Sequence, residues 1–114
     1  MQVRVEIETD EPGLARELLE VKDSKISGGM KKQLSHEVVV RLDGFRLTEE
    51  GPEEALNTVK LLVDFNTKVG ANLLANWIIK RVEGRRASLK IEGLDCRLEE
   101  GEITRILMGK LEVQ

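Results

Sequence analysis

The sequence predicts an α+β fold, in which a small antiparallel sheet (an N-terminal strand plus two hairpins) packs on a long central helix and two short helices. Residues 2–8 alternate between apolar and polar, as a half-buried strand does. Acid-glycine pairs at 43–44 and 92–93 lie between alternating runs, which is typical of two-residue hairpins. The 114 residues show no linker-like change in composition, so residues 1–114 are predicted to form a single domain.

The chain begins with a predicted strand, a short helix and a loop. Residues 2–8 place Val3, Val5 and Ile7 on one face. A helix is expected from Asp10 to about Val21, because Asp is a good N-cap and leucines follow at helical spacing. Residues 22–35 are rich in Ser, Gly and Lys and predict a loop. Its glycines lack the GxxxxGK[ST] spacing of a phosphate-binding loop, so a solvated loop is the favoured interpretation.

The first hairpin is predicted over residues 37–47, with Asp43-Gly44 as its turn. Such a turn needs positive φ at both central positions, which Asp-Gly accepts. This register would place Leu42 opposite Phe45 and Val40 opposite Leu47, giving one apolar face.

The second hairpin is predicted around Glu92-Gly93. One register gives three apolar pairs and two pairs of opposite charge, and a slip of one residue would destroy both patterns. The expected apolar pairs are Ile91 with Leu94, Leu89 with Cys96 and Ala87 with Leu98. The expected pairs on the other face are Lys90 with Asp95, Ser88 with Arg97 and Arg86 with Glu99.

The central helix is predicted to begin near Pro52 and to end near Arg81, with Gly84 closing it. Gly70 is its expected weak point, where a kink or a division would occur. The final helix is predicted over residues 102–111, since apolar residues there share one helical face.

Composition argues against several classes of function. The net charge of −3, the pI near 5.3 and the three aromatic residues disfavour nucleic-acid binding. A chain with one cysteine, Cys96, and one histidine, His36, is not expected to bind a metal, and no cofactor motif is present. Cys96 is expected in the core rather than in a catalytic pair, and the paired glutamates are expected to be helix-start charges, so no catalytic residue is predicted. Without a leader or an apolar span, the expected location is cytoplasmic and no membrane contact is predicted.

Residues 70–79 are apolar on almost every side, whereas a soluble helix needs one apolar stripe. This excess predicts either the core itself or an interface with a protein partner, including a second copy of the chain, and both interpretations stay open. The candidate interface residues are Leu73, Leu74, Trp77, Ile78 and Ile79. A separate cluster of cations is a candidate patch for an anionic partner, consisting of Lys80, Arg81, Arg85, Arg86 and Lys90.

The run Ala75-Asn76-Trp77-Ile78-Ile79-Lys80-Arg81, followed by a hairpin and a terminal helix, resembles the effector-associated constant component domains of bacterial conflict systems. The resemblance covers about residues 55–111. It implies a non-catalytic protein-protein interaction module, acting as an adaptor or an oligomerising component. The alternative is a small inhibitor or immunity-type protein that binds and blocks an enzyme or a nucleic-acid machine.

Overall fold

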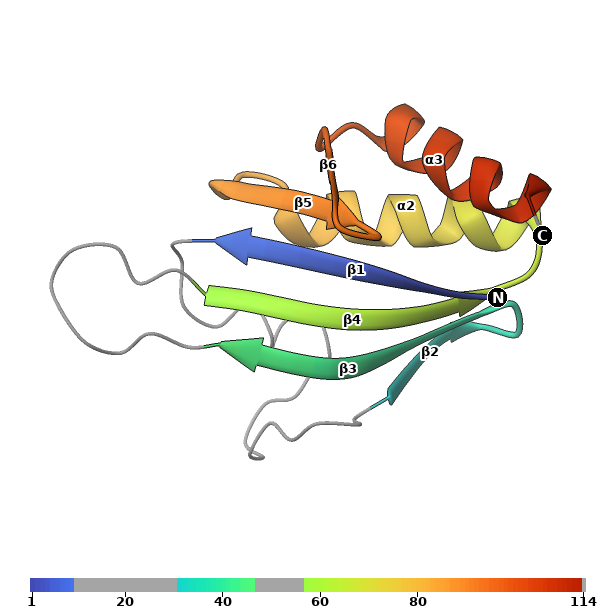
Figure 1. Ribbon diagram of the computed structural model, residues 1–114, viewed down its shortest axis with the longest axis horizontal. Helices are drawn as coiled ribbons and strands as arrows, with labels where there is room; N and C mark the ends of the chain where they lie inside the picture. The colour runs from blue at the N-terminus through green and yellow to red at the C-terminus, as the bar shows by residue number, and fades with distance from the viewer. Residues whose placement is uncertain (10–30, 47–56, 114) are drawn as a thin grey trace, which may run out of the picture.

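The computed structural model describes residues 1–9, 31–46 and 57–113, and it confirms the α+β class. An antiparallel sheet has the strand order β2-β3-β4-β1-β5-β6, and two helices accompany it (Figure 1). The strands are β1 (Gln2–Thr9), β2 (Lys31–Ser35), β3 (Val38–Arg46), β4 (Asn57–Phe65), β5 (Ala87–Ile91) and β6 (Leu94–Cys96). The helices are α2 (Lys68–Val82) and α3 (Glu100–Glu112). The helix expected over residues 10–21 lies outside the described residues.

The N-terminal strand is confirmed and lies inside the sheet, between β4 and β5. Its apolar residues are fully buried and face apolar residues on both neighbours. Val5, for example, pairs with Leu61 of β4 and with Ile91 of β5. Strict alternation therefore predicted this strand correctly, because one face of it is core and the other is not.

The prediction of a long central helix was wrong, because residues 57–65 of the predicted segment form a strand. β4 occupies residues 57–65 and pairs with β1 on one side and β3 on the other. Val59, Leu61 and Val63 alternate with less buried residues, the period of a strand, but Leu62 on the opposite face obscures that alternation. Within the described part of the predicted segment, the helix covers residues 68–82, so it is of moderate length.

The prediction of a hairpin over residues 37–47 was also wrong, because β3 runs through Asp43-Gly44 without turning back. The pairing between β3 and β4 shifts register between Leu42 and Gly44, which is a β-bulge rather than a turn. Leu42 pairs with Leu61 instead of Phe45. The true partner of β3 on its other side is β2, which lies in the segment predicted as a loop, and the turn between them is at His36 and Glu37. Leu47 lies outside the described residues.

The second hairpin is confirmed in its predicted register. Ile91 pairs with Leu94, Lys90 with Asp95 and Leu89 with Cys96. Both turn residues have positive φ, 52° at Glu92 and 80° at Gly93, as the turn requires. The ladder ends at Cys96, so the outer pairs expected at residues 97–99 are not part of it.

The start of α2 is fixed against the turn between β2 and β3. Thr67 is the N-cap, and its Oγ1 accepts a hydrogen bond from the Gly70 N–H at 3.0 Å while donating one to Glu37 at 3.1 Å. Gly70 does not divide the helix as expected. It is buried, and a Cβ there would come within 3.2 Å of Val38 Cγ2, 3.3 Å of the Glu37 carbonyl oxygen and 3.3 Å of Phe65 Cβ. Glycine is therefore needed for close approach of the helix to the sheet.

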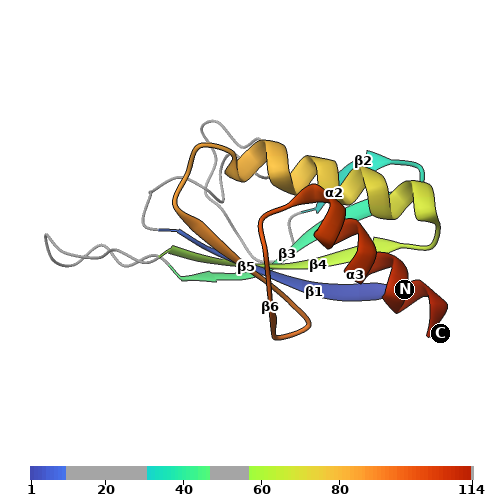
Figure 2. The same cartoon turned by 90° about the horizontal axis from the view of Figure 1, so that it is seen from above.

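Both helices cover one face of the sheet, and the core lies between the two layers (Figure 2). α3, confirmed close to its predicted bounds, packs beside α2 and buries Ile103 and Leu107. β2 lies on the other side of α2. The core comprises Val3, Val5, Ile7, Val38, Val40, Leu42, Val59, Leu61, Val63, Phe65, Ala71, Leu74, Ala75, Ile78, Val82, Leu89, Ile91, Cys96, Ile103 and Leu107.

Candidate functional site

α2 carries two apolar stripes, and the fold buries only one of them. The core stripe faces the sheet and α3, and it consists of Ala71, Leu74, Ala75, Ile78 and Val82. The second stripe, which we call the outer stripe, consists of Val69, Leu73 and Trp77, spaced four residues apart. Val69 is 58% exposed and Leu73 is 41% exposed. The apolar residues in excess of one stripe therefore lie in two different places, some in the core and some on the surface.

The five predicted interface residues divide between these stripes. Leu74 and Ile78 are completely buried in the core, so they cannot contact a partner while the chain is folded. Ile79 is partly buried and packs against the core. Leu73 and Trp77 remain available on the outer stripe.

A groove runs between the outer stripe and β2. It has a volume of about 450 Å³ and is lined by Leu34, Leu73, Asn76, Trp77, Lys80 and Arg81. We call it the α2–β2 groove. Leu34 comes from β2, and sequence reasoning missed it because it lies in a short polar segment that gave no strand signal. The groove thus joins a helix and a strand that are distant in the sequence, and apolar and basic side chains both line it.

The indole of Trp77 has an unusual environment within this groove. The side chain is partly buried and packs against the core, yet its Nε1 atom is inaccessible and has no hydrogen-bond partner among the described residues. A buried N–H without an acceptor costs roughly 1–3 kcal/mol compared with a satisfied one. Trp77 therefore anchors α2 on the core, while its N–H stays a buried donor without a partner among the described residues.

The predicted basic cluster is not a single patch. Lys80 and Arg81 lie in the last turn of α2, Arg85 and Arg86 lie in the following connection, and Lys90 lies on β5. Arg81, Arg85 and Arg86 each already make an interaction with another group. Lys90 pairs in register with Asp95 and Glu6 on the sheet face opposite the helices. The five cations are therefore divided between the two layers.

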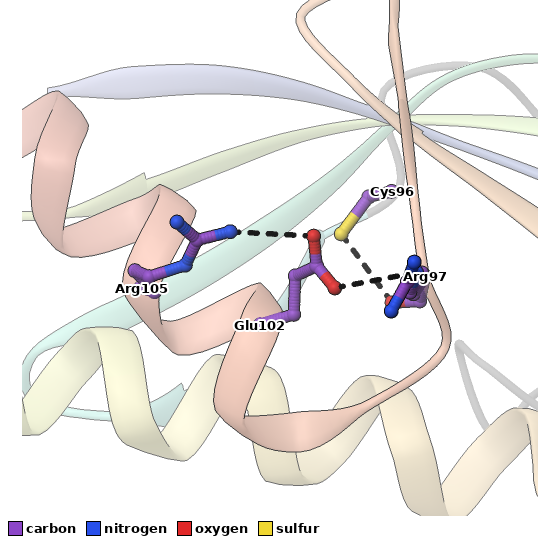
Figure 3. Close-up of polar contacts among 4 residues, drawn as sticks. All are labelled: Cys96, Arg97, Glu102 and Arg105. Carbon is purple, nitrogen blue, oxygen red and sulfur yellow. Dashed lines mark hydrogen bonds and ion pairs between the residues drawn. The ribbon is translucent and has the colours of Figure 1, made fainter.

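Cys96 lies where β6 meets α3, near a small polar cluster (Figure 3). The Glu102 carboxylate lies between Arg105, at 3.4 Å, and Arg97, at 3.9 Å. Burial, and then the negative charge of Glu102, raises the pKa of the Cys96 thiol above its ordinary value, although Arg105 acts in the opposite direction. The thiol donates a 3.4 Å hydrogen bond to the Arg97 carbonyl oxygen. Cys96 is thus a protonated, structural thiol at neutral pH and a poor nucleophile.

Cys96 and His36 cannot act as a pair within one chain. His36 is in the exposed turn after β2, at one edge of the sheet, and Cys96 is on β6 at the other edge. Five strand spacings of about 4.8 Å separate these edges, or roughly 24 Å. Over residues 1–9, 31–46 and 57–113, no group of three or more His, Cys, Asp or Glu residues is placed to hold a metal ion.

Comparison with protein-family models, curated proteins and solved structures finds no significant match to this chain. The resemblance to effector-associated domains accordingly stays a prediction. Neither α2 nor α3, the helices in the described part of the chain, is long and apolar enough to cross a membrane.

Proposed function

We propose that this protein is a non-catalytic protein-protein interaction module that uses the α2–β2 groove and the outer stripe as its contact surface. The observation that carries the proposal is the second apolar stripe on α2, which the sheet and α3 leave exposed at Val69 and Leu73. Exposed apolar groups gathered beside a groove favour a protein contact over a polar ligand.

The shape of the groove supports a partner that inserts apolar side chains. Leu34, Leu73 and Trp77 supply apolar contacts from two elements, while Asn76 and Lys80 offer hydrogen-bond donors. Large apolar and aromatic side chains with polar neighbours are typical of binding hot spots.

The simplest partner is a second copy of the chain, as in an oligomerising component of a bacterial conflict system. Mass in solution tests this directly. For the wild type we expect an oligomer by light scattering, and for Leu73→Glu a folded monomer, because a charge would be buried in the apolar interface. Asn72→Glu is the matched control, since Asn72 is exposed and does not line the groove.

Circular dichroism of each variant would show that it is folded. A wild type that stays monomeric at high concentration would exclude self-association, and the adaptor role would then require a different protein at the same groove. Equal loss of assembly in Leu73→Glu and Asn72→Glu would contradict the groove as the contact surface.

A further inference from the structure

The face of the sheet opposite α2 and α3, which we call the open face, carries a row of three cations and one leucine across four strands. Lys31 on β2 pairs with Arg41 on β3, Arg41 pairs with Leu62 on β4, and Leu62 pairs with Arg4 on β1. Residues that pair directly point to the same face, so these four side chains form one line. Lys31 and Arg4 are exposed, and Arg41 and Leu62 are partly exposed.

The side chains of the three cations in this row make no ion pair with the described part of the protein. No side chain in the described segments makes an ion pair or hydrogen bond with the side chains of Lys31, Arg41 or Arg4. Glu92 uses its carboxylate to accept a 2.9 Å hydrogen bond from the backbone N–H of Arg4. Although the chain is acidic overall, its described part therefore carries a line of positive charge on one surface.

Two acidic residues lie close to the row. Glu92 is at its β5 end, beside Arg4, where it exchanges hydrogen bonds with the Arg4 backbone, and the exposed Asp43 follows Arg41 by two residues, in the bulge of β3. The other acidic groups of the open face lie in other rows. Glu6 lies between Lys60 and Lys90 in the neighbouring row, and Asp64 lies in the row beyond Leu62 on the other side. Glu8, paired with Ser88, lies two rows away on β1, and Asp95, opposite Lys90, lies on the edge strand β6 in the same row as Glu6. An anionic polymer running over the whole face would meet these carboxylates, whereas a short ligand confined to Arg41, Leu62 and Arg4 would not lie over those of the other rows.

Leu62 is the apolar member of the row. It stands between two arginines, with Arg41 on one side and Arg4 on the other, each one strand away. Two strand spacings place the arginines about 10 Å apart. The complementary surface is an apolar group flanked by two carboxylates at a similar distance, and arginine is suited to bidentate contact with carboxylates.

We propose that the open face docks an acidic amphipathic helix of a partner protein, with an apolar side chain on Leu62 and carboxylates on Arg4 and Arg41. Helix residues seven apart are separated by about 10.5 Å, and the residue three or four positions along lies between them on the same side. An acid, an apolar residue and a second acid at that spacing match the row. The inference rests on the proposed function as a protein-binding module, but it uses a different surface.

A designed helical peptide of the same chemistry can stand in for the partner helix. The probe is an alanine-rich peptide of about 18 residues with glutamates seven apart and leucine between them, and its matched control carries glutamines instead. In a titration of isotope-labelled protein at low salt, we expect saturable amide shifts centred on residues 4, 41 and 62. We expect the control peptide to bind about tenfold more weakly, because it lacks the two charge-assisted contacts.

Variants of the protein complete the test. Arg4→Gln with Arg41→Gln should weaken binding of the glutamate peptide about tenfold, while Lys68→Gln with Lys110→Gln, which makes the same change in net charge on the helix layer, should leave it within twofold. Leu73→Glu should bind the peptide normally, because the groove is not used. Equal weakening by both double variants would overturn the proposal.

Other outcomes would also overturn it. The absence of saturable shifts would exclude the docked helix. Shifts at α2 and β2 would place the peptide in the groove, so that the proposed function would survive and the open-face site would fail. An oligonucleotide that binds through Arg4 and Arg41 more tightly than the peptide would identify a phosphate backbone as the ligand instead.

Discussion

The two apolar stripes of α2 differ in what covers them, although their residues are of the same kinds. The core stripe lies on the sheet and against α3, and every member is buried. The outer stripe borders the α2–β2 groove, and two of its three members are exposed. Leu73 and Leu74 are neighbours with identical side chains, yet one is 41% exposed and the other completely buried. Apolar character in a helix therefore indicates what it contacts only after the position of every other element is known.

Truncating the core stripe should have the largest effect. Leu74→Ala removes a buried side chain beneath the sheet and α3, and we expect a loss of about 2–5 kcal/mol in the free energy of unfolding. Urea denaturation followed by circular dichroism measures it. A loss below about 1 kcal/mol would mean that the stripe is not packed as described.

Gly70→Ala should have the next largest effect. The added Cβ meets a backbone oxygen and the Cβ of Phe65, neither of which can move freely, and that cost outweighs the higher helix propensity of alanine. We expect a net loss of roughly 1–2 kcal/mol in the free energy of unfolding, again measured by urea denaturation. Gly109→Ala in α3 is the matched control, because its Cβ would meet open space, and it should stabilise the protein by up to about 1 kcal/mol.

Removing the N-cap of α2 should have a moderate effect. Thr67→Ala deletes the acceptor of the Gly70 N–H and the donor to Glu37, and should cost about 1 kcal/mol. Thr67→Ser keeps both hydrogen bonds and should behave nearly as the wild type. If serine and alanine proved equally destabilising, packing of the threonine methyl group rather than capping would be responsible.

Leu73→Ala should have the smallest effect on stability. It is the sharpest test of the difference between the core stripe and the outer stripe. Because Leu73 is exposed beside the groove, we expect a loss below about 1 kcal/mol in the free energy of unfolding of the monomer. The same substitution should weaken any complex formed through the groove. A loss as large as that of Leu74→Ala would show that the outer stripe belongs to the core.

Sequence patterns predicted those elements whose signals are local and mutually consistent. β1 alternates strictly, and the second hairpin gives apolar and charged pairs in one register. β4 was missed because Leu62, on the open face, makes its alternation look like a continuous apolar run. Asp43-Gly44 was wrongly predicted to be a turn, because an acid-glycine pair is compatible with a β-bulge as well as with a turn. Pairing with the neighbouring strands determines which of the two forms.

The candidate surfaces were predictable only in part. Leu73 and Trp77 could be named from the sequence, but not separated from Leu74 and Ile78, because the helical pattern does not reveal which side the sheet occupies. The cation row could not be predicted, since Lys31, Arg41 and Arg4 come from three strands that are brought together only by the strand order. Pairing between distant segments is tertiary information.

The central place of β1 also affects how the protein folds. Its neighbours are β4 and β5, and its nearest partner along the chain is Asn57, which pairs with Thr9. A nascent chain therefore exposes Val3, Val5 and Ile7 until residues beyond 57 have been synthesised, and the strand gains its second neighbour only when β5 follows. Such non-local pairing slows folding, because loop closure must precede the gain from contact. We expect the rate-limiting step to be the insertion of β1 between β4 and β5.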